Sequence, residues 1–441
     1  MIRRLLGGRI THLLETASAL AFEIVLAAAT FVTFPLIVRS LGSAEYGEYN
    51  LIYTFTGLAG AWVLSSGGVA LVQLLVQRKT NLDQSVHVAH RQVLMFAGPF
   101  GGVLFAVTVW KLGAGVIPAA LIIFGTELLI TGWAEINLNA LYAHRGQTPV
   151  TNIRMAAPIA KVIGVLLLFS VGVINLLSLA IVNMIAATIA MLLSVRAVSR
   201  LHRYEGMLDL DTPTMMSPKE LRHYSFMHAT TMTAYTLQND GDNIALGLFR
   251  SKEELGEYAA AYRLVSTAML PLRAVMTVSY RYFLQHDDNK QGQHFRRAKK
   301  LMIPTGAYGL LCGIGVFVFL PVTKWLLGPE FKEAAEITLW LCAFPIMRAA
   351  VDVPLLGILG LGRNRVRMTI GLLGAGVAVT AYVLLVPPFG WRGGVIGTYI
   401  SETIVATVAW ISLAVLERKH DRARLNAPDA DVEVTAQGLT P

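Results

Sequence analysis

Long apolar segments recur along the whole chain, and they limit its possible folds more than any other feature. Apolar residues make up 54% of the 441 residues and charged residues only 15%, whereas a soluble domain carries about 25% charged residues. The sequence therefore predicts an all-α integral membrane protein that crosses the bilayer many times. We place twelve transmembrane helices at 18–38, 49–71, 91–110, 116–138, 150–171, 174–195, 223–248, 255–280, 302–324, 335–359, 368–388 and 394–415.

The basic residues give an orientation to these spans. When the connecting segments are taken alternately, 26 of the 37 Lys and Arg residues fall in one set, seven in the other and four within spans. By the positive-inside rule the basic set faces the cytoplasm, so both termini are predicted to be cytoplasmic. This distribution explains the net charge of +9 and predicts no nucleic-acid partner. The first apolar run is long enough to span, which favours an uncleaved helix over a signal peptide.

One short phrase occurs twice in the chain. "GEYNLIY" begins at Gly47 and "GEYAAAY" begins at Gly256, and six predicted spans separate the two copies. The copies therefore share one orientation, which is typical of parallel halves related by an axis along the membrane normal. We predict an N-terminal lobe over 1–203, a cytoplasmic linker over 204–222, a C-terminal lobe over 223–420 and a disordered tail over 421–441.

The residues around this repeat are typical of helix starts. Ser251 and Glu254 have the spacing of a capping box, and Glu48 and Glu257 lie where the helix dipole favours negative charge. The tyrosines of both copies are predicted to lie in the outer aromatic belt: Tyr49, Tyr53, Tyr258 and Tyr262. The alternative interpretation of the repeat is an external gate that faces a ligand.

Basic residues inside predicted spans are candidates for substrate binding, because a charge in the bilayer is costly. Arg154 and Lys161 share one face of the fifth span, and Arg263 and Arg273 belong to the eighth. Together they predict a cationic cavity that suits a phosphate or diphosphate through charge-assisted hydrogen bonds. For Arg154 the alternative is a side chain that snorkels to the inner surface.

Acidic residues inside spans are candidates for ion coupling. Glu23, Glu127, Asp240 and Asp242 belong to this set, and the last two lie in "QNDGDN" around Gly241. A helix break there would expose carboxylates and carbonyls to H⁺ or Na⁺. The alternative is that these carboxylates neutralise the basic residues. Arg348 and Asp352 have the i, i+4 spacing of an ion pair.

No motif in the sequence indicates catalysis. It contains no G-x-S-x-G, no P-loop and no H-E-x-x-H, and its two cysteines, Cys312 and Cys342, lie in apolar runs outside any His/Cys cluster. The sequence predicts that the protein is not an enzyme and uses neither a cofactor nor a metal ion.

Several segments resemble those of one family of transporters, the Wzx-type polysaccharide flippases. The segments are "FPLIVRSLGSAEYGEYNLIYTF", "DNIALGLFRSKEELGEYAAAYRL", "LGPEFKEAA", "LGLGRNR" and "VPPFGWRGGVIGTYISE". The resemblance implies membership of the MOP superfamily, with a MATE-like fold of two six-helix lobes in a V. The chain departs from the family pattern at Asn243, where members often have a basic residue, and at the additional Asp240.

The resemblance also implies a function. It implies alternating-access export of a polyprenyl-diphosphate-linked oligosaccharide across the bacterial inner membrane, for surface polysaccharide biosynthesis. The expected partners are that glycan, membrane lipids, H⁺ or Na⁺ and glycan polymerase machinery, and the expected state is a monomer. One alternative is a MATE-like ion-coupled exporter of drugs or metabolites, whose cavity should be acidic. Another is a membrane-bound glycan polymerase or ligase, which would need a large external loop.

Overall fold

The computed structural model describes residues 2–78, 82–205, 218–272 and 293–425, together with 275, 276, 279 and 283. The described residues form helices and no strand, which confirms the all-α prediction. The first half contains α1 (Ile2–Arg78), α2 (Leu82–Phe96), η1 (Ala97–Gly101), α3 (Gly102–Leu112), η2 (Ala114–Val116), α4 (Ile117–Gly125), η3 (Thr126–Thr131), α5 (Gly132–Arg145), α6 (Gln147–Arg154), α7 (Ala156–Val171) and α8 (Leu176–Glu205). The second half contains α9 (Pro218–Phe249), α10 (Lys252–Ala268), α12 (Gln293–Val318), α13 (Leu320–Leu327), α14 (Ala334–Trp340), α15 (Phe344–Gly360), α16 (Asn364–Phe389) and α17 (Trp391–Leu425).

The helices have the length and composition of membrane spans. Eight helical stretches of the described residues are long and apolar enough to cross a bilayer, or nine if α14 and α15, bent by 41°, form one span. The longest helix, α1, contains the first two predicted spans, joined by a kink at Gly42 with φ 72°. The chain is therefore a multi-pass membrane protein. The count of twelve spans and the side on which the termini lie stay predictions.

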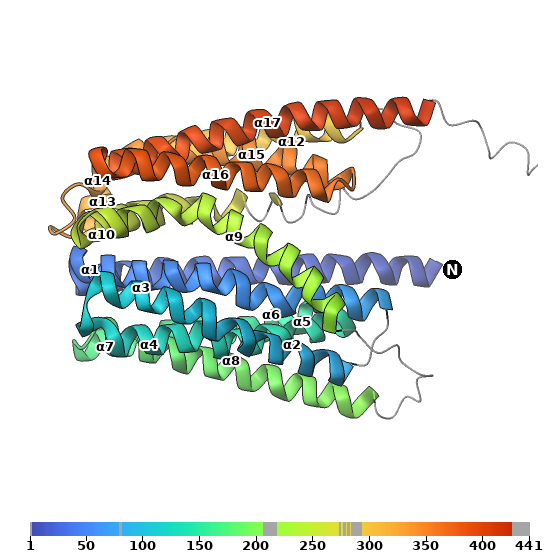
Figure 1. Ribbon diagram of the computed structural model, residues 1–441, viewed down its shortest axis with the longest axis horizontal. Helices are drawn as coiled ribbons and strands as arrows, with labels where there is room; N and C mark the ends of the chain where they lie inside the picture. The colour runs from blue at the N-terminus through green and yellow to red at the C-terminus, as the bar shows by residue number, and fades with distance from the viewer. Residues whose placement is uncertain are drawn as a thin grey trace, which may run out of the picture.

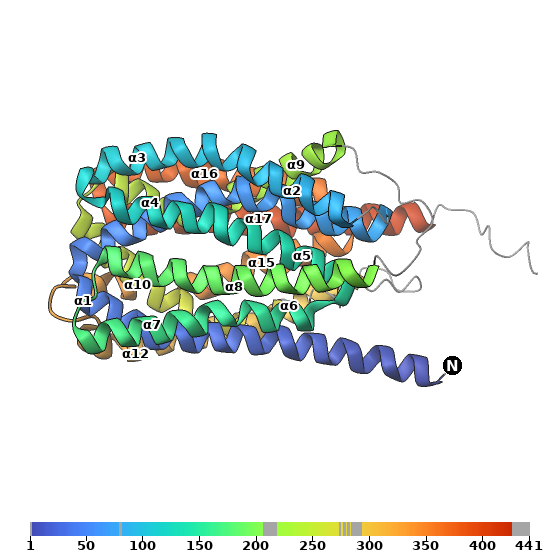
Figure 2. The same ribbon diagram turned by 90° about the horizontal axis from the view of Figure 1, so that it is seen from below.

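Two groups of helices lie side by side (Figure 1). Helices α1 to α8 form the N-terminal group, and α9 to α17 form the C-terminal group, in which α9 and α10 pack directly on α1. Figure 2 shows the first part of α1 running beside α7. We call the end where α1 begins and α17 finishes the basic end, and the opposite end, where α1 kinks, the closed end. The predicted lobe boundaries stay predictions, and residues 206–217 of the linker and 426–441 of the tail lie outside the described residues.

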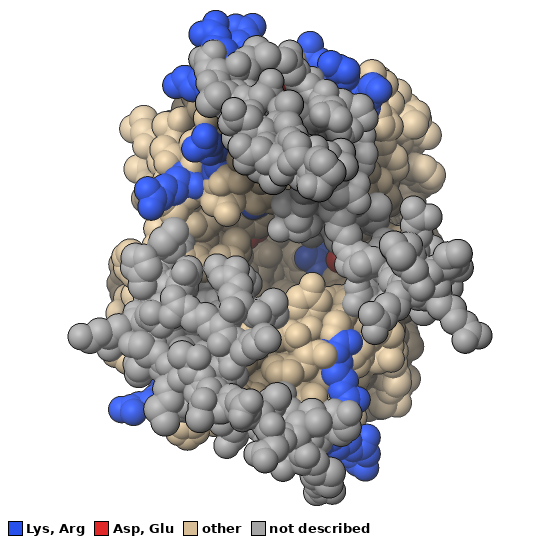
Figure 3. Space-filling view, turned by 90° about the vertical axis from the view of Figure 1, so that its right-hand side faces the viewer, with Lys and Arg blue, Asp and Glu red and all other residues tan. Residues whose placement is uncertain are grey.

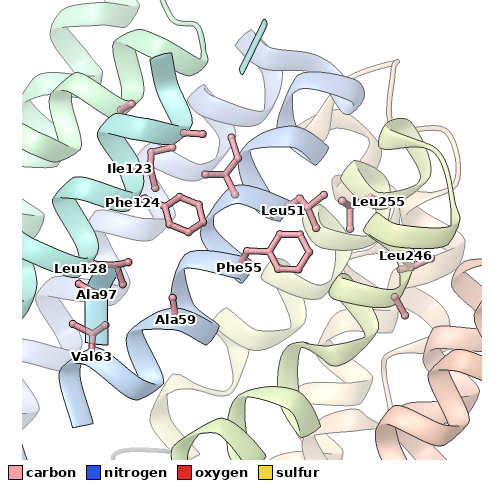
Figure 4. Close-up of a cluster of buried hydrophobic side chains, with 14 of the residues drawn as sticks. Leu51, Phe55, Ala59, Val63, Ala97, Ile123, Phe124, Leu128, Leu246 and Leu255 are labelled. Carbon is pink, nitrogen blue, oxygen red and sulfur yellow. The ribbon is translucent and has the colours of Figure 1, made fainter. Parts of the chain in front are cut away.

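The second part of α1 forms the core between the two groups. Figure 4 shows Leu51 and Phe55 of α1 between Phe124 of α4 on one side and Leu246 and Leu255 on the other. Leu51 also fills the space left by the missing side chain of Gly247 on α9, where an added Cβ would lie 2.3 Å from Leu51 Cδ1. This part of α1 therefore holds α9 and α10 against the N-terminal group.

The two copies of the repeated phrase face each other across the groups at the closed end. A Cβ added to Gly47 would lie 2.0 Å from the carbonyl oxygen of Lys252, and a Cβ added to Gly256 would lie 1.8 Å from that of Ser43. Real Cβ atoms do not approach other atoms so closely, so only glycine allows the two backbones to touch. The contact is reciprocal, because each glycine faces the carbonyl that lies four residues before the other.

The glutamates near these glycines cap helices in an equivalent way. Glu45 accepts a hydrogen bond from the backbone N–H of Leu176 at 2.6 Å, where α8 begins, and Glu254 accepts one from Trp391 at 2.7 Å, where α17 begins. Carboxylates satisfy free N–H groups at helix starts and stabilise the helix dipole. The predicted capping box is confirmed in its first half, since Ser251 Oγ accepts from the N–H of Glu254 at 3.2 Å. The carboxylate of Glu254 caps α17 rather than its own helix.

Replacing either glycine with alanine should open the closed end. In Gly47→Ala or Gly256→Ala, the new methyl group would overlap a carbonyl of the other helix group, so the two backbones must separate by about 1 Å or more. We expect a longer distance between spin labels at Val173 and Lys332, one on each group, in double electron–electron resonance. The control is Gly57→Ala, also on α1, because no atom lies within 4 Å of the added Cβ. An unchanged distance in both Gly47→Ala and Gly256→Ala would contradict the contact.

Candidate functional site

A cavity of about 510 Å³ lies between the two helix groups. Its walls come from both parts of α1 and from α7 in the N-terminal group, and from α9 and α10 in the C-terminal group. Figure 3 looks at the basic end and shows a hollow between the groups, with Lys or Arg and acidic atoms in its depth and basic side chains around its rim. The cavity is large enough for a small-molecule or headgroup ligand.

Two of the predicted basic residues meet in this cavity. Lys161 of α7 and Arg263 of α10 both line it, from opposite groups. Neither forms an ion pair with any residue that the structure describes. Lys161 Nζ lies 5.7 Å from the ring centre of Tyr53, within the range of a cation–π contact. Within the described part of the chain, these two cations have no carboxylate partner and give the cavity its positive charge. Arg273 lies outside the described residues.

Arg154 lies elsewhere. It is the last residue of α6, does not line the cavity, and forms an ion pair with Glu135 of α5 at 2.5 Å. The two side chains are about one-third exposed, at 31% and 29%. The structure therefore does not bring Arg154 together with Lys161, although both residues lie on the segment of the fifth predicted span.

Tyrosines form much of the cavity wall, which corrects the prediction of an outer aromatic belt. The lining includes Tyr46, Tyr49, Tyr53, Tyr235 and Tyr262, whereas Tyr258 is fully buried. The rings of Tyr49 and Tyr53 pack at 4.6 Å between centres. The hydroxyl of Tyr53 is buried and forms no hydrogen bond that meets standard geometry with a described residue.

The two aspartates of "QNDGDN" point in different directions. Helix α9 is continuous from Pro218 to Phe249, so the predicted break at Gly241 is wrong. Residues two apart on a helix point about 200° apart. Asp240 therefore lines the cavity, while Asp242 is directed into the C-terminal group and is only 1% exposed.

The other two acidic candidates, Glu23 and Glu127, do not line the cavity. Glu23 is half-buried on α1 and makes no hydrogen bond or ion pair with any described residue. Glu127 lies in the first turn of η3, a π-helical segment between α4 and α5. Its carboxylate accepts a hydrogen bond from Asn183 of α8 at 2.8 Å. π-Helical turns are frequent at functional sites, so Glu127 stays a candidate within the N-terminal group.

A buried ion-pair network supports the cavity wall from the C-terminal group. Arg348 pairs with Asp352 at 3.3 Å, which confirms the predicted pair, and also with Glu402 of α17 at 3.1 Å. Its Nη1 donates to Asn239 Oδ1 at 2.7 Å, and Asn239 lines the cavity. Arg348 therefore orients a polar group of the wall. The sequence spacing revealed the first partner but not Glu402, which is distant along the chain.

Comparison with known proteins gives the family. Residues 36–335 match the family described as "Polysaccharide biosynthesis protein". The chain belongs to this family. The match covers the repeat, the cavity residues Lys161 and Arg263, and both aspartates of α9, and it confirms the resemblance predicted from the sequence. The search of curated proteins found no match to this chain.

Solved structures show the same fold as this family member. An inward-facing multidrug resistance MATE family transporter of the MOP superfamily superposes with a TM-score of 0.68 at 11% identity, covering 91% of this chain and 99% of that one. The lipid II flippase MurJ, in an inward closed conformation, gives 0.67 at 12% identity, with 97% and 94% covered. An outward-facing MATE family transporter gives 0.57 at 12% identity, with 92% and 96% covered. The chain therefore shares the fold of these MATE family transporters and of MurJ.

Removing the buried guanidinium should strongly destabilise the C-terminal group. In Arg348→Met, the carboxylates of Glu402 and Asp352 lose their cation, and breaking a buried pair costs about 3–5 kcal/mol. We expect a large fall in the thermal unfolding midpoint of the detergent-solubilised protein. Combining Arg348→Met with Glu402→Leu should recover part of this loss, because the most deeply buried carboxylate is then absent.

The matched control is Arg392→Met. Its pair with Glu336 is about half exposed on both sides, at 53% and 48%, so we expect a loss below about 1 kcal/mol. Equal effects of Arg348→Met and Arg392→Met would contradict a structural role for the buried network.

Proposed function

We propose that this protein flips a polyprenyl-diphosphate-linked oligosaccharide across the bacterial inner membrane by alternating access, as a step of surface polysaccharide biosynthesis. The observation that carries the proposal is a pair of cations, Lys161 and Arg263, which line one cavity from two different helix groups. Neither cation forms an ion pair with a described residue. The family, whose description is polysaccharide biosynthesis, supports the substrate class. The fold shared with a lipid II flippase supports the mode of transport.

The chemistry of the cavity suits such a headgroup. A diphosphate carries several negative charges and acceptor oxygens, which Lys and Arg bind through charge-assisted hydrogen bonds. The tyrosine rings offer apolar faces and hydroxyl groups, which suit the C–H and O–H groups of sugars. Because one cation belongs to each helix group, a bound diphosphate would connect the two groups and favour their movement together.

The conformation fits the cytoplasm-facing step of this cycle. The two helix groups are in contact around Gly47 and Gly256, and a hollow lies between them at the basic end. If the basic end faces the cytoplasm, as the Lys and Arg distribution predicts, the cavity is ready to receive the glycan headgroup on the side where it is made. The lipid tail would remain in the bilayer.

Ion coupling is the second part of the proposal. Asp240 in the cavity wall and Asp242 behind it are the carboxylates that would bind and release the coupling cation as it moves down its gradient across the membrane. Glu127 and Glu23 are further candidates. Both aspartates lie on α9, which packs on α1 of the other group. A charge change there would act where the two groups meet.

An exporter of cationic drugs is the competing function, because the fold is shared with MATE family transporters. Such an exporter needs an acidic cavity to bind a cation. Among the described lining residues, the charged side chains are Lys161, Arg263 and Asp240, which leaves a net positive wall. This balance favours an anionic headgroup.

Removing both cations should stop glycan export. In Lys161→Ala/Arg263→Ala, the diphosphate loses two charge-assisted hydrogen-bonding partners, each equivalent to about 1.5–3 kcal/mol. We expect surface polysaccharide in a complemented deletion strain to fall at least about tenfold, with unchanged protein in the membrane. The measurement is quantification of the extracted surface glycan.

Two controls separate charge from packing. Lys161→Arg/Arg263→Lys keeps both charges and should retain most export, and Arg365→Ala removes an exposed charge on α16 at no cost to export. Normal surface glycan in the double alanine variant would contradict the proposal. Resistance to cationic drugs on overexpression, without a glycan phenotype, would assign the exporter function instead.

A further inference from the structure

A chain of hydrogen bonds connects the cavity to the buried Asp242. Asn50 of α1 donates through Nδ2 to Asn243 Oδ1 of α9 at 3.0 Å. Asn243 in turn donates to Asp242 Oδ1 through its own Nδ2 at 3.1 Å and its backbone N–H at 2.7 Å. Asn50 and Asn243 both line the cavity. The chain therefore joins the two helix groups and ends on a carboxylate that the cavity does not touch.

Hydrogen-bond donors from three helices surround that carboxylate. The hydroxyl of Tyr258 on α10 donates to Asp242 Oδ2 at 2.5 Å, and Thr398 Oγ1 on α17 lies 3.4 Å from the same oxygen. From α16, the hydroxyl of Tyr382 shares a hydrogen bond with Thr398 at 3.1 Å. On α9 itself, Asp240 is a like charge two residues before Asp242. No Lys, Arg or His of the described residues forms an ion pair with Asp242.

This environment sets the direction of the Asn243 amide. An ionised carboxylate only accepts hydrogen bonds, so the NH₂ of Asn243 must face Asp242 and its oxygen must face Asn50. The negative charge also polarises the amide and strengthens its oxygen as an acceptor. When Asp242 Oδ1 takes up a proton it gains an O–H donor and keeps some acceptor capacity. Either side of the Asn243 amide can then face it, so the carboxyl group no longer fixes the direction of the amide.

We infer that Asn243 is a positioning residue that transmits the protonation of Asp242 to the contact between the two helix groups. Ionised Asp242 holds the Asn50–Asn243 hydrogen bond and stabilises the conformation closed around Gly47 and Gly256. Protonated Asp242 releases this bond and favours separation of the groups at the closed end. The inference rests on the proposed alternating access and assigns its driving ion as H⁺.

The donors explain why the site suits a proton better than Na⁺. A hard cation needs oxygen ligands that turn their lone pairs toward it. Both bonds to Asp242 Oδ1 come from N–H groups of Asn243, which repel a cation. A proton needs only one carboxylate oxygen and a rearranged amide.

The test measures the closed end as a function of pH without any glycan. Spin labels at Val173 and Lys332, in a Cys312→Ser/Cys342→Ser background, report the distance between the groups in the full-length protein in lipid nanodiscs. For the otherwise unaltered protein we expect the ratio of separated to closed populations to rise about tenfold as pH falls from 9 to 5. Asn50→Leu, Asn243→Leu and Asp242→Asn should each reduce this change to less than about twofold.

The control is Asn139→Leu, because the amide of Asn139 donates within its own helix, to the backbone carbonyl of Glu135 at 2.8 Å; it should keep the full pH response. A full response in Asn50→Leu or Asp242→Asn would overturn the inference, as would a response to Na⁺ at fixed pH with none to pH. Because the assay contains no glycan, a wrong substrate class leaves its result unchanged. Normal glycan export by an Asp242→Asn variant that has lost the pH response would contradict Asp242 as the coupling site and leave the proposed substrate standing.

Discussion

The contact between two glycines at the closed end is the interaction on which the rest of the architecture depends. Gly47 and Gly256 let the backbones of α1 and α10 touch, and this contact joins the two helix groups at the closed end. Glu45 and Glu254, two residues before these glycines, fix the starts of α8 and α17. The same short phrase therefore sets both the closure between the groups and the position of one helix within each.

Equivalent positions differ where the chemistry begins. Arg263 stands on α10 seven residues after its glycine, and the corresponding position of α1 is Thr54, another residue of the cavity wall. The positive charge of the N-terminal group comes instead from Lys161 of α7. The repeated residues form the scaffold, whereas the cations of the cavity lie at positions where the two halves differ. This is the expected division between scaffold and binding site.

The sequence predicted the charged residues of the cavity better than its walls. Lys161 and Arg263 stood out because a charge inside an apolar segment is costly. The tyrosines were misplaced because an aromatic residue near a helix end looks the same in a membrane interface and in a cavity wall. Arg154 pairs with Glu135 of another helix, and sequence spacing cannot show contacts between distant segments. Asn50 and Asn243 were missed, although uncharged amides in apolar spans are themselves a signal for contacts between helices.

The central claim is transport of an anionic lipid-linked glycan, and reconstitution tests it most directly. The purified protein would be placed in proteoliposomes with a polyprenyl-diphosphate-linked oligosaccharide, and transfer between leaflets would be followed by its accessibility to an added glycosidase. The account predicts transfer that requires the protein and is competed by polyprenyl diphosphate but not by the corresponding uncharged alcohol. Transport of an organic cation, with no movement of the lipid-linked glycan, would contradict it.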